Sequence, residues 1–308
     1  MLAFRYRDKG TVIHKLNPFC KLLWVVSVLV FALIFDHPVY LLLLFLSTMP
    51  VIIAATVRNE WLSVMKLTLY LCIAIVIINM MLSYHGSHVL LEAPFRIPVM
   101  GTPTVTLEAM VFGLAMSLRL LAIISAFAVL TFTIHPDDLM LSMIKMKLPY
   151  KSVLVTSLST RFIPTLVDDL ECISDVQRSR GLELDKGKLP QRIKSRMSIM
   201  IPLLCNALDR AVQVSEAMES LAFGSGTKRT FYKEIRMSRV DVVTLTLGFF
   251  TIGFGIFMCL SGFGDYQYYP TLEVISMGGL EWSVLSLLIC LLLSVVMLAF
   301  VKRSSDLD

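Results

Sequence analysis

The 308 residues are 56% hydrophobic and only 17% charged, and their mean hydropathy is +0.75. Soluble domains usually carry about 25% charged residues, so this composition excludes an ordinary soluble domain and indicates a polytopic membrane protein. The formal net charge is +5, and the position of that charge predicts topology, because Lys and Arg are retained on the cytoplasmic side of membrane spans.

Six membrane spans are predicted from apolar runs that approach the ~20 residues a helix needs to cross the hydrocarbon. They lie near 19–35, 38–55, 62–82, 108–134, 240–261 and 281–301. The first two should form a hairpin, because Pro38 has no amide hydrogen to give to a continuing helix. No cleavable signal peptide is expected, since the first apolar run begins late and has no Ala-x-Ala-like site.

Basic residues gather on one side of these spans. Of the 28 Lys and Arg residues, only Arg96 falls in a loop of the opposite side, and only Arg119 falls deep inside a span, since Lys21 and Lys66 flank the cytoplasmic ends of theirs. Both termini and the long interval before the fifth span are therefore predicted to be cytoplasmic. The expected fold is all-α, with four spans in 1–134, cytoplasmic helices in 135–239 and two spans in 240–308.

The polar interval 135–239 is too long for a connecting loop. Three helices are expected in it, over about 137–147, about 151–181 and about 191–222. Apolar residues recur every three or four positions along the last two: Leu166, Val167, Leu170, Ile173 and Val176, then Met197, Ile201, Leu204, Leu208, Ala211, Ser215, Met218 and Ala222. These amphipathic helices lie outside the lipid, so their apolar stripes must pack on one another or on a partner.

The end of the second amphipathic helix has the clearest functional signal. Gly181 is a plausible left-handed stop, which places Arg178 and Arg180 in the last turn. Their charge would complement the helix dipole by about 0.3–1 kcal/mol. An arginine fork at such a tip could also pair with a carboxylate in the groove of a partner, and helix-in-groove docking is the mode that we infer.

Other classes of function have less support. The five histidines are dispersed, the six cysteines include no Cys-x-x-Cys pair, and no metal or catalytic motif is found. An ion-coupled carrier would be expected to place carboxylates at mid-membrane, often in two related halves. The spans contain almost no acidic residue, with Glu108 at an end, and no repeat is visible. A carrier that acts without ATPases remains the alternative.

Several short motifs follow one another in an order that resembles the EcfT/CbiQ family over roughly residues 14–230. They are Thr11-Val12-Ile13-His14-Lys15-Leu16-Asn17-Pro18 with Lys21, Thr131-Phe132-Thr133 with Pro136-Asp137-Asp138-Leu139, Leu148-Pro149, Arg161-Phe162-Ile163-Pro164, Gln177-Arg178-Ser179-Arg180-Gly181, and Ala217-Met218-Glu219-Ser220 leading to Phe223-Gly224. Members of this family are the transmembrane coupling (T) components of energy-coupling factor ABC transporters.

The resemblance implies a non-catalytic subunit in the plasma membrane of a prokaryote. Two cytoplasmic ABC ATPase subunits, which carry ATP and Mg²⁺, would dock on its coupling helices, and the chain itself would bind no cofactor. A separate membrane protein, the S component, would capture a vitamin or a metal ion. The coupling helices would pass the movement of the ATPases to the S component.

The family also implies docking residues, because it has an x-Arg-x motif at the tip of each of two coupling helices. Ser179-Arg180-Gly181 matches the first motif. The second falls at Ser220-Leu221-Ala222, where Leu221 replaces the expected arginine and Ala222 replaces the common glycine. This second tip is expected to dock by apolar contact, helped by Lys228 and Arg229.

Arg119 is a further candidate, because an arginine inside a span is by default a functional residue. A structural role is favoured for it, and contact with the S component is the second reading.

Overall fold

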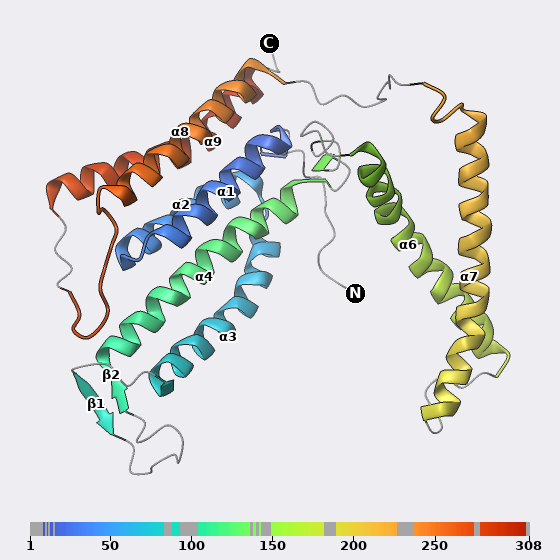
Figure 1. Cartoon of the computed structure of the whole chain (residues 1–308), viewed down its shortest axis with the longest axis horizontal. Coiled ribbons are helices and arrows are strands. Elements are labelled where there is room, and N and C mark those ends of the chain that lie inside the picture. The colour runs from blue at the N-terminus through green and yellow to red at the C-terminus, as the bar shows by residue number, and fades with distance from the viewer. Residues whose placement is uncertain are drawn as a thin grey trace. The chain divides into compact units, whose positions relative to one another are not determined.

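The computed structural model describes residues 9, 11, 13–14, 16–82, 88–92, 104–135, 138–139, 142, 149–181, 189–226, 237–273 and 278–305. These residues form helices and one short β ribbon (Figure 1). The elements are α1 (Pro18–Ile34), α2 (Pro38–Ala55), α3 (Arg58–Leu82), β1 (Val89–Glu92), β2 (Thr104–Thr106), α4 (Leu107–Thr133), α6 (Tyr150–Ser179), α7 (Leu189–Ser220), α8 (Arg239–Leu260) and α9 (Gly279–Ser305). Two compact units result, one of 1–138 with 236–308 and one of 139–235.

The prediction of a helical, polytopic membrane protein is confirmed. Among the described residues, five helices are long and apolar enough to cross a membrane, namely α2, α3, α4, α8 and α9. The first predicted span corresponds to α1, which is a shorter apolar helix of 17 residues.

Local sequence explains where the first helices begin. Pro18 and Pro38 stand at the starts of α1 and α2, where the missing amide hydrogen of proline costs nothing. The side chain of Asn17 accepts a hydrogen bond from the amide of Phe19, and the ring of His37 accepts one from the amide of Val39. These caps satisfy donors that a helix start leaves open.

In the unit of 1–138 with 236–308, α4 contacts α1, α2 and α3, while α8 packs on both α1 and α9 (Figure 1). The hydrophobic core lies among α1, α2, α4, α8 and α9. Its largest fully buried apolar side chains include Phe31, Ile52, Met258, Leu285 and Leu292. Large apolar side chains of α3 are instead exposed, as expected for a surface that faces lipid: Leu67, Leu69, Tyr70, Ile73, Ile77 and Ile78.

One face of α8 lets this helix approach α1 closely. The buried residues of α8 recur every three or four positions and most are small: Asp241, Thr244, Gly248, Thr251, Gly255 and Met258. A Cβ atom added at Gly255 would overlap the ring of Phe31. Small residues bring two backbones together in membrane helices, so glycine is required at this position by the ring opposite.

The unit of 139–235 is built on α6 and α7, which pack on each other. The side-chain amide of Gln177 donates to the backbone carbonyl of Ser198 at 3.4 Å, and the guanidinium of Arg210 donates to the carboxylate of Asp169 at 3.0 Å. Residue numbers fall along α6 as they rise along α7, so the two helices are antiparallel (Figure 1). Most of the helix predicted over about 137–147 lies outside the described residues.

Candidate functional site

The first candidate docking residue, Arg180, caps the C-terminus of α6. Its amide donates to the carbonyl of Val176 at 3.1 Å, and the amide of Gly181 donates to the carbonyl of Arg178 at 2.9 Å. Gly181 has a φ of 85°, the left-handed conformation that the sequence predicts for a helix stop. A Cβ atom on Gly181 would meet nothing within 4 Å, so the backbone conformation alone favours glycine here.

Charge is exposed at this first tip. Arg180, Arg178 and Ser179 are all exposed. Arg178 lies 3.7 Å from the carboxylate of Asp175 in a solvent-exposed pair, and such pairs contribute little to stability. No ion pair holds the guanidinium of Arg180 within the part of the chain that the structure describes. That guanidinium is therefore available to a partner.

The second candidate tip, at the end of α7, has the same backbone arrangement. The amide of Leu221 donates to the carbonyl of Ala217 at 3.2 Å, and the amide of Ala222 donates to the carbonyl of Glu219 at 2.8 Å. Ala222 has a φ of 54° although it is not a glycine. A further bond of 2.9 Å from the amide of Phe223 to the carbonyl of Met218 completes a Schellman motif.

Arg180 and Leu221 thus occupy equivalent positions. Each is the last residue before a left-handed one, and each donates its amide four residues back along its helix. The side chain of Leu221 is 82% exposed. Lys228 and Arg229, proposed to support this tip, lie outside the described residues.

The two tips belong to opposite ends of the α6–α7 pair (Figure 1). Gln177, close to the first tip, contacts Ser198 in the first third of α7. At about 1.5 Å per residue, roughly 33 Å of helix separates Ser198 from the end of α7. Two partners could therefore bind the two tips without competing for one surface.

The apolar stripe predicted on α7 faces away from α6. Arg210 and Ser198 bond to α6, whereas the stripe falls on the opposite side of α7 at 100° per residue. Its large apolar members are half or more exposed: Met197, Ile201, Leu204 and Leu208, continued by Val212. The α6–α7 contact therefore leaves this surface for another partner.

Arg119, the candidate inside a span, has partners in its own unit. It is part of α4, about 18 Å of helix from Leu107, and its Nη2 donates to the carbonyl of Phe35 at 3.1 Å and to the carboxylate of Asp36 at 2.5 Å. Sequence reasoning missed this pair, because 83 positions separate the two residues. The contacts support a structural role, in which Arg119 ties the turn between α1 and α2 to α4.

The loop after α8 closes over the same turn. The amides of Asp36 and His37 both donate to the carbonyl of Gly264, at 3.0 and 2.9 Å, and the hydroxyl of Tyr268 donates to the carbonyl of Asp36 at 2.5 Å. Burial, together with the carboxylate of Asp36, raises the pKa of Tyr268, so its hydroxyl stays protonated and can donate. Tyr266 and Tyr268 of this loop are both buried.

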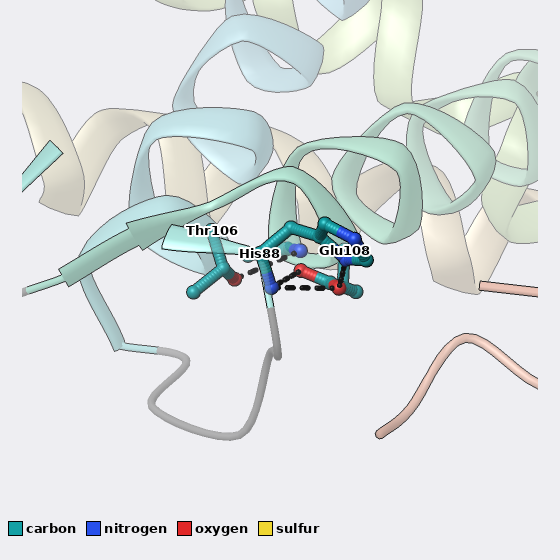
Figure 2. A network of polar contacts seen from close by, with 4 residues as sticks. His88, Thr106 and Glu108 are labelled. Carbon is teal, nitrogen blue, oxygen red and sulfur yellow. Dashed lines mark hydrogen bonds and ion pairs between the residues drawn. The ribbon is translucent and has the colours of Figure 1, made fainter. Parts of the chain in front are cut away.

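A buried carboxylate anchors the β ribbon to α4 (Figure 2). Glu108 is fully buried, and its carboxylate accepts hydrogen bonds from the backbone amide of His88 at 3.1 Å and lies 2.9 Å from the ring of the same residue. Thr106 caps α4 by accepting from the amide of Ala109. The sequence does not reveal this anchor, because β1 and β2 are only four and three residues long.

Comparison with known proteins places these features in a family. The family model CbiQ, described as cobalt transport protein, matches residues 9–232. The energy-coupling factor transporter transmembrane protein EcfT of Heliobacterium modesticaldum is 31% identical over 268 residues, covering 83% of this chain and 95% of the relative. EcfT of Staphylococcus aureus is 29% identical, covering 80% of this chain and 92% of the relative. EcfT of Lactococcus lactis subsp. cremoris is also 29% identical, covering 82% and 96%.

Proposed function

The chain belongs to the CbiQ family, whose EcfT members are transmembrane components of energy-coupling factor transporters, and we propose that it couples ATP hydrolysis by partner subunits to solute uptake. Two cytoplasmic ABC ATPase subunits bind the tips of α6 and α7. A separate S component in the membrane captures the solute, a vitamin or a metal ion.

The observation that carries this proposal is the exposed Arg180 at the end of α6. A guanidinium presents donors in a planar fork that matches a carboxylate, and such a pair is strongest where water is excluded. The left-handed Gly181 ends the helix immediately after the arginine, so no further turn of α6 shields the fork. A groove in an ATPase subunit that holds a carboxylate can therefore receive this tip.

The α6–α7 pair supports a role in transmission. Arg210 and Asp169 bond the two helices about two thirds of the way along each, so a displacement of one tip is passed to both helices. The exposed stripe of α7, from Met197 to Val212, gives the S component an apolar surface on which to bind. In this mechanism the chain catalyses no reaction, and ATP and Mg²⁺ stay on the partner subunits.

The proposed topology follows from the positions of the basic residues. The plasma membrane of a prokaryote holds the unit of 1–138 with 236–308 as a multi-pass protein, and both termini face the cytoplasm with the α6–α7 unit. This orientation places the tips where ATPase subunits have access to them.

Purification and reconstitution test the proposal. The tagged chain is extracted from its native membrane in detergent, and co-eluting proteins are identified by mass spectrometry. We expect ATPase subunits to co-elute with the wild-type chain and Arg180→Glu to reduce their amount by about tenfold or more, because losing a charge-assisted hydrogen bond and gaining a repulsion exceeds ~1.4 kcal/mol.

Uptake into proteoliposomes supplies the second measurement. Solute uptake that requires the ATPases and ATP is expected of a coupling component. Uptake by this chain alone, driven by an ion gradient, would instead establish the ion-coupled carrier and reject the proposal. Arg58→Glu, which reverses the charge of an exposed arginine at the start of α3, is the matched control and should leave ATPase binding unchanged.

A further inference from the structure

The two tips of the α6–α7 pair have the same backbone and opposite chemistry. Arg180 and Leu221 are equivalent helix caps, as their hydrogen bonds and the left-handed residues that follow them show. The first tip exposes two arginines, Arg178 and Arg180, whereas the described part of the second exposes Leu221, and the charged residues in the last two turns of α7 are both acidic, Glu216 and Glu219. One kind of groove cannot complement both surfaces.

A groove that suits Arg180 would be unfavourable for Leu221. A carboxylate that faces the arginine fork is compensated when it is buried, but the same carboxylate beneath a leucine would be desolvated with no donor to pair with it. An apolar pocket reverses this preference, since it gains from burying a leucine side chain and loses from burying a guanidinium. The residue at the cap position therefore selects the groove.

The second tip is exposed in a way that suits insertion into a pocket. Leu221 is 82% exposed, the largest exposure of any large apolar residue described in the α6–α7 unit. The Schellman bond from Phe223 to Met218 fixes the backbone on both sides of Leu221. A leucine on a fixed cap loses little backbone freedom on binding.

A lipid surface is a less suitable occupant than a protein groove. The cytoplasmic leaflet is anionic and attracts clusters of basic residues, whereas the charged residues in the last two turns of α7 are both acidic, Glu216 and Glu219. Because Leu221 and Arg180 are equivalent cap residues, we expect both tips to bind the same kind of partner, an ATPase subunit.

The geometry points to an apolar plug: Leu221 inserts into an ATPase groove that lacks the carboxylate facing Arg180, so the transporter carries two unlike ATPase chains in a fixed order. This inference rests on the proposed function and specifies its second docking site. Arg180 binds one ATPase chain by an ionic contact, and Leu221 binds the other by an apolar contact.

Substitutions at Leu221 test the apolar plug, because the inference predicts in which direction each one changes the amount of bound ATPase. The full chain is purified in detergent with the ATPase subunits that co-elute with it, and their amounts per chain are measured by quantitative mass spectrometry. Leu221→Met keeps an apolar side chain of similar volume and should retain wild-type amounts. Leu221→Arg should lower the amount of bound ATPase by about tenfold or more, because the pocket must then accept a charge. Leu221 is exposed, so neither variant disturbs the packing of α7.

Gln213→Arg is the matched control, since it adds the same charge at an exposed position of α7 two turns before the tip, and it should retain wild-type amounts. Equal or increased binding by Leu221→Arg would overturn the inference, because it would mean an acidic groove or a lipid contact at this tip. A single kind of ATPase chain in the wild-type complex would also overturn it. If the wild-type chain retains no ATPase, the proposed function itself fails, whereas loss by Arg180→Glu without loss by Leu221→Arg rejects only the plug.

Discussion

The guanidinium of Arg210 in α7 donates to the carboxylate of Asp169 in α6 at 3.0 Å, and this bond joins the two helices whose tips are the candidate docking sites. Both side chains are less than one third exposed. The second terminal nitrogen of Arg210 is buried without a hydrogen-bond partner among the described residues, so the guanidinium depends on this carboxylate.

Removal of Asp169 should therefore loosen the α6–α7 pair. We expect Asp169→Ala and Arg210→Met each to destabilise the contact by about 1–2 kcal/mol, because either change leaves the other partly buried charge unpaired. Limited proteolysis of the purified chain, with cleavage sites identified by mass spectrometry, measures the opening of the two helices. Arg196→Met, at an exposed arginine of α7, should leave the cleavage rate at the wild-type value, and equal rates for all three variants would contradict the prediction.

The left-handed residues at the two tips predict a reciprocal pair of substitutions. Ala222→Gly should stabilise the end of α7 by about 0.5–1 kcal/mol and Gly181→Ala should destabilise the end of α6 by a similar amount, since only glycine adopts a positive φ without steric cost. The added methyl at Gly181 would touch nothing, so its effect would be purely conformational. Hydrogen exchange of the amides in the last turn of each helix measures both changes, and shifts of the same sign would argue against this account.

Glycine at position 255 is predicted to be essential for the packing of α8 on α1. Gly255→Ala would push the ring of Phe31, which is fully buried, out of its site, and overpacking of this kind costs about 1–3 kcal/mol. Gly253→Ala is the control on the same helix, because its new methyl would meet nothing within 4 Å. Thermal unfolding in detergent should show a lower midpoint for Gly255→Ala alone. An equal decrease for both variants would mean that any methyl group added to α8 destabilises the protein, which would contradict a specific clash with the ring of Phe31.

We expect Arg119 to stabilise the fold and not to bind a partner subunit. Arg119→Met keeps much of the side-chain volume but leaves Asp36 without its donor, so a loss of about 1–3 kcal/mol is expected. Thermal unfolding and co-purification of the S component separate the two readings of this residue. A lower unfolding midpoint with the S component retained supports the structural role. An unchanged midpoint with the S component lost would assign Arg119 to the contact with that partner.

Native cysteines offer a test of the proposed topology. Cys172 in α6 and Cys205 in α7 are both exposed, and both belong to the unit proposed to be cytoplasmic. A membrane-impermeant maleimide should label them in inside-out vesicles and leave them unlabelled in intact cells. The variant with both Cys172→Ser and Cys205→Ser identifies the signal, and labelling of the wild-type chain from outside the cell would reverse the orientation.

Family resemblance and helix pattern predicted much of the candidate site. The end of α6 at a left-handed Gly181 could be predicted from sequence, because a helix stop depends on residues that are neighbours in the chain. The conformation of Ala222 could not be predicted in this way, since alanine ordinarily continues a helix. The family motif predicts a glycine at this position, and the structure adds that Ala222 adopts a left-handed conformation there, with a φ of 54°.

The sequence by itself determined that this chain crosses a membrane, where its apolar helices lie and which tip has the arginine, because hydropathy, helix period and caps are properties of short segments. Tertiary structure decided which surfaces meet: Arg119 with Asp36, Gly255 with Phe31, and the stripe of α7 on the side away from α6. Such pairings join residues that are distant in the chain, and their energies depend on packing and on the burial of polar groups, which no local pattern specifies.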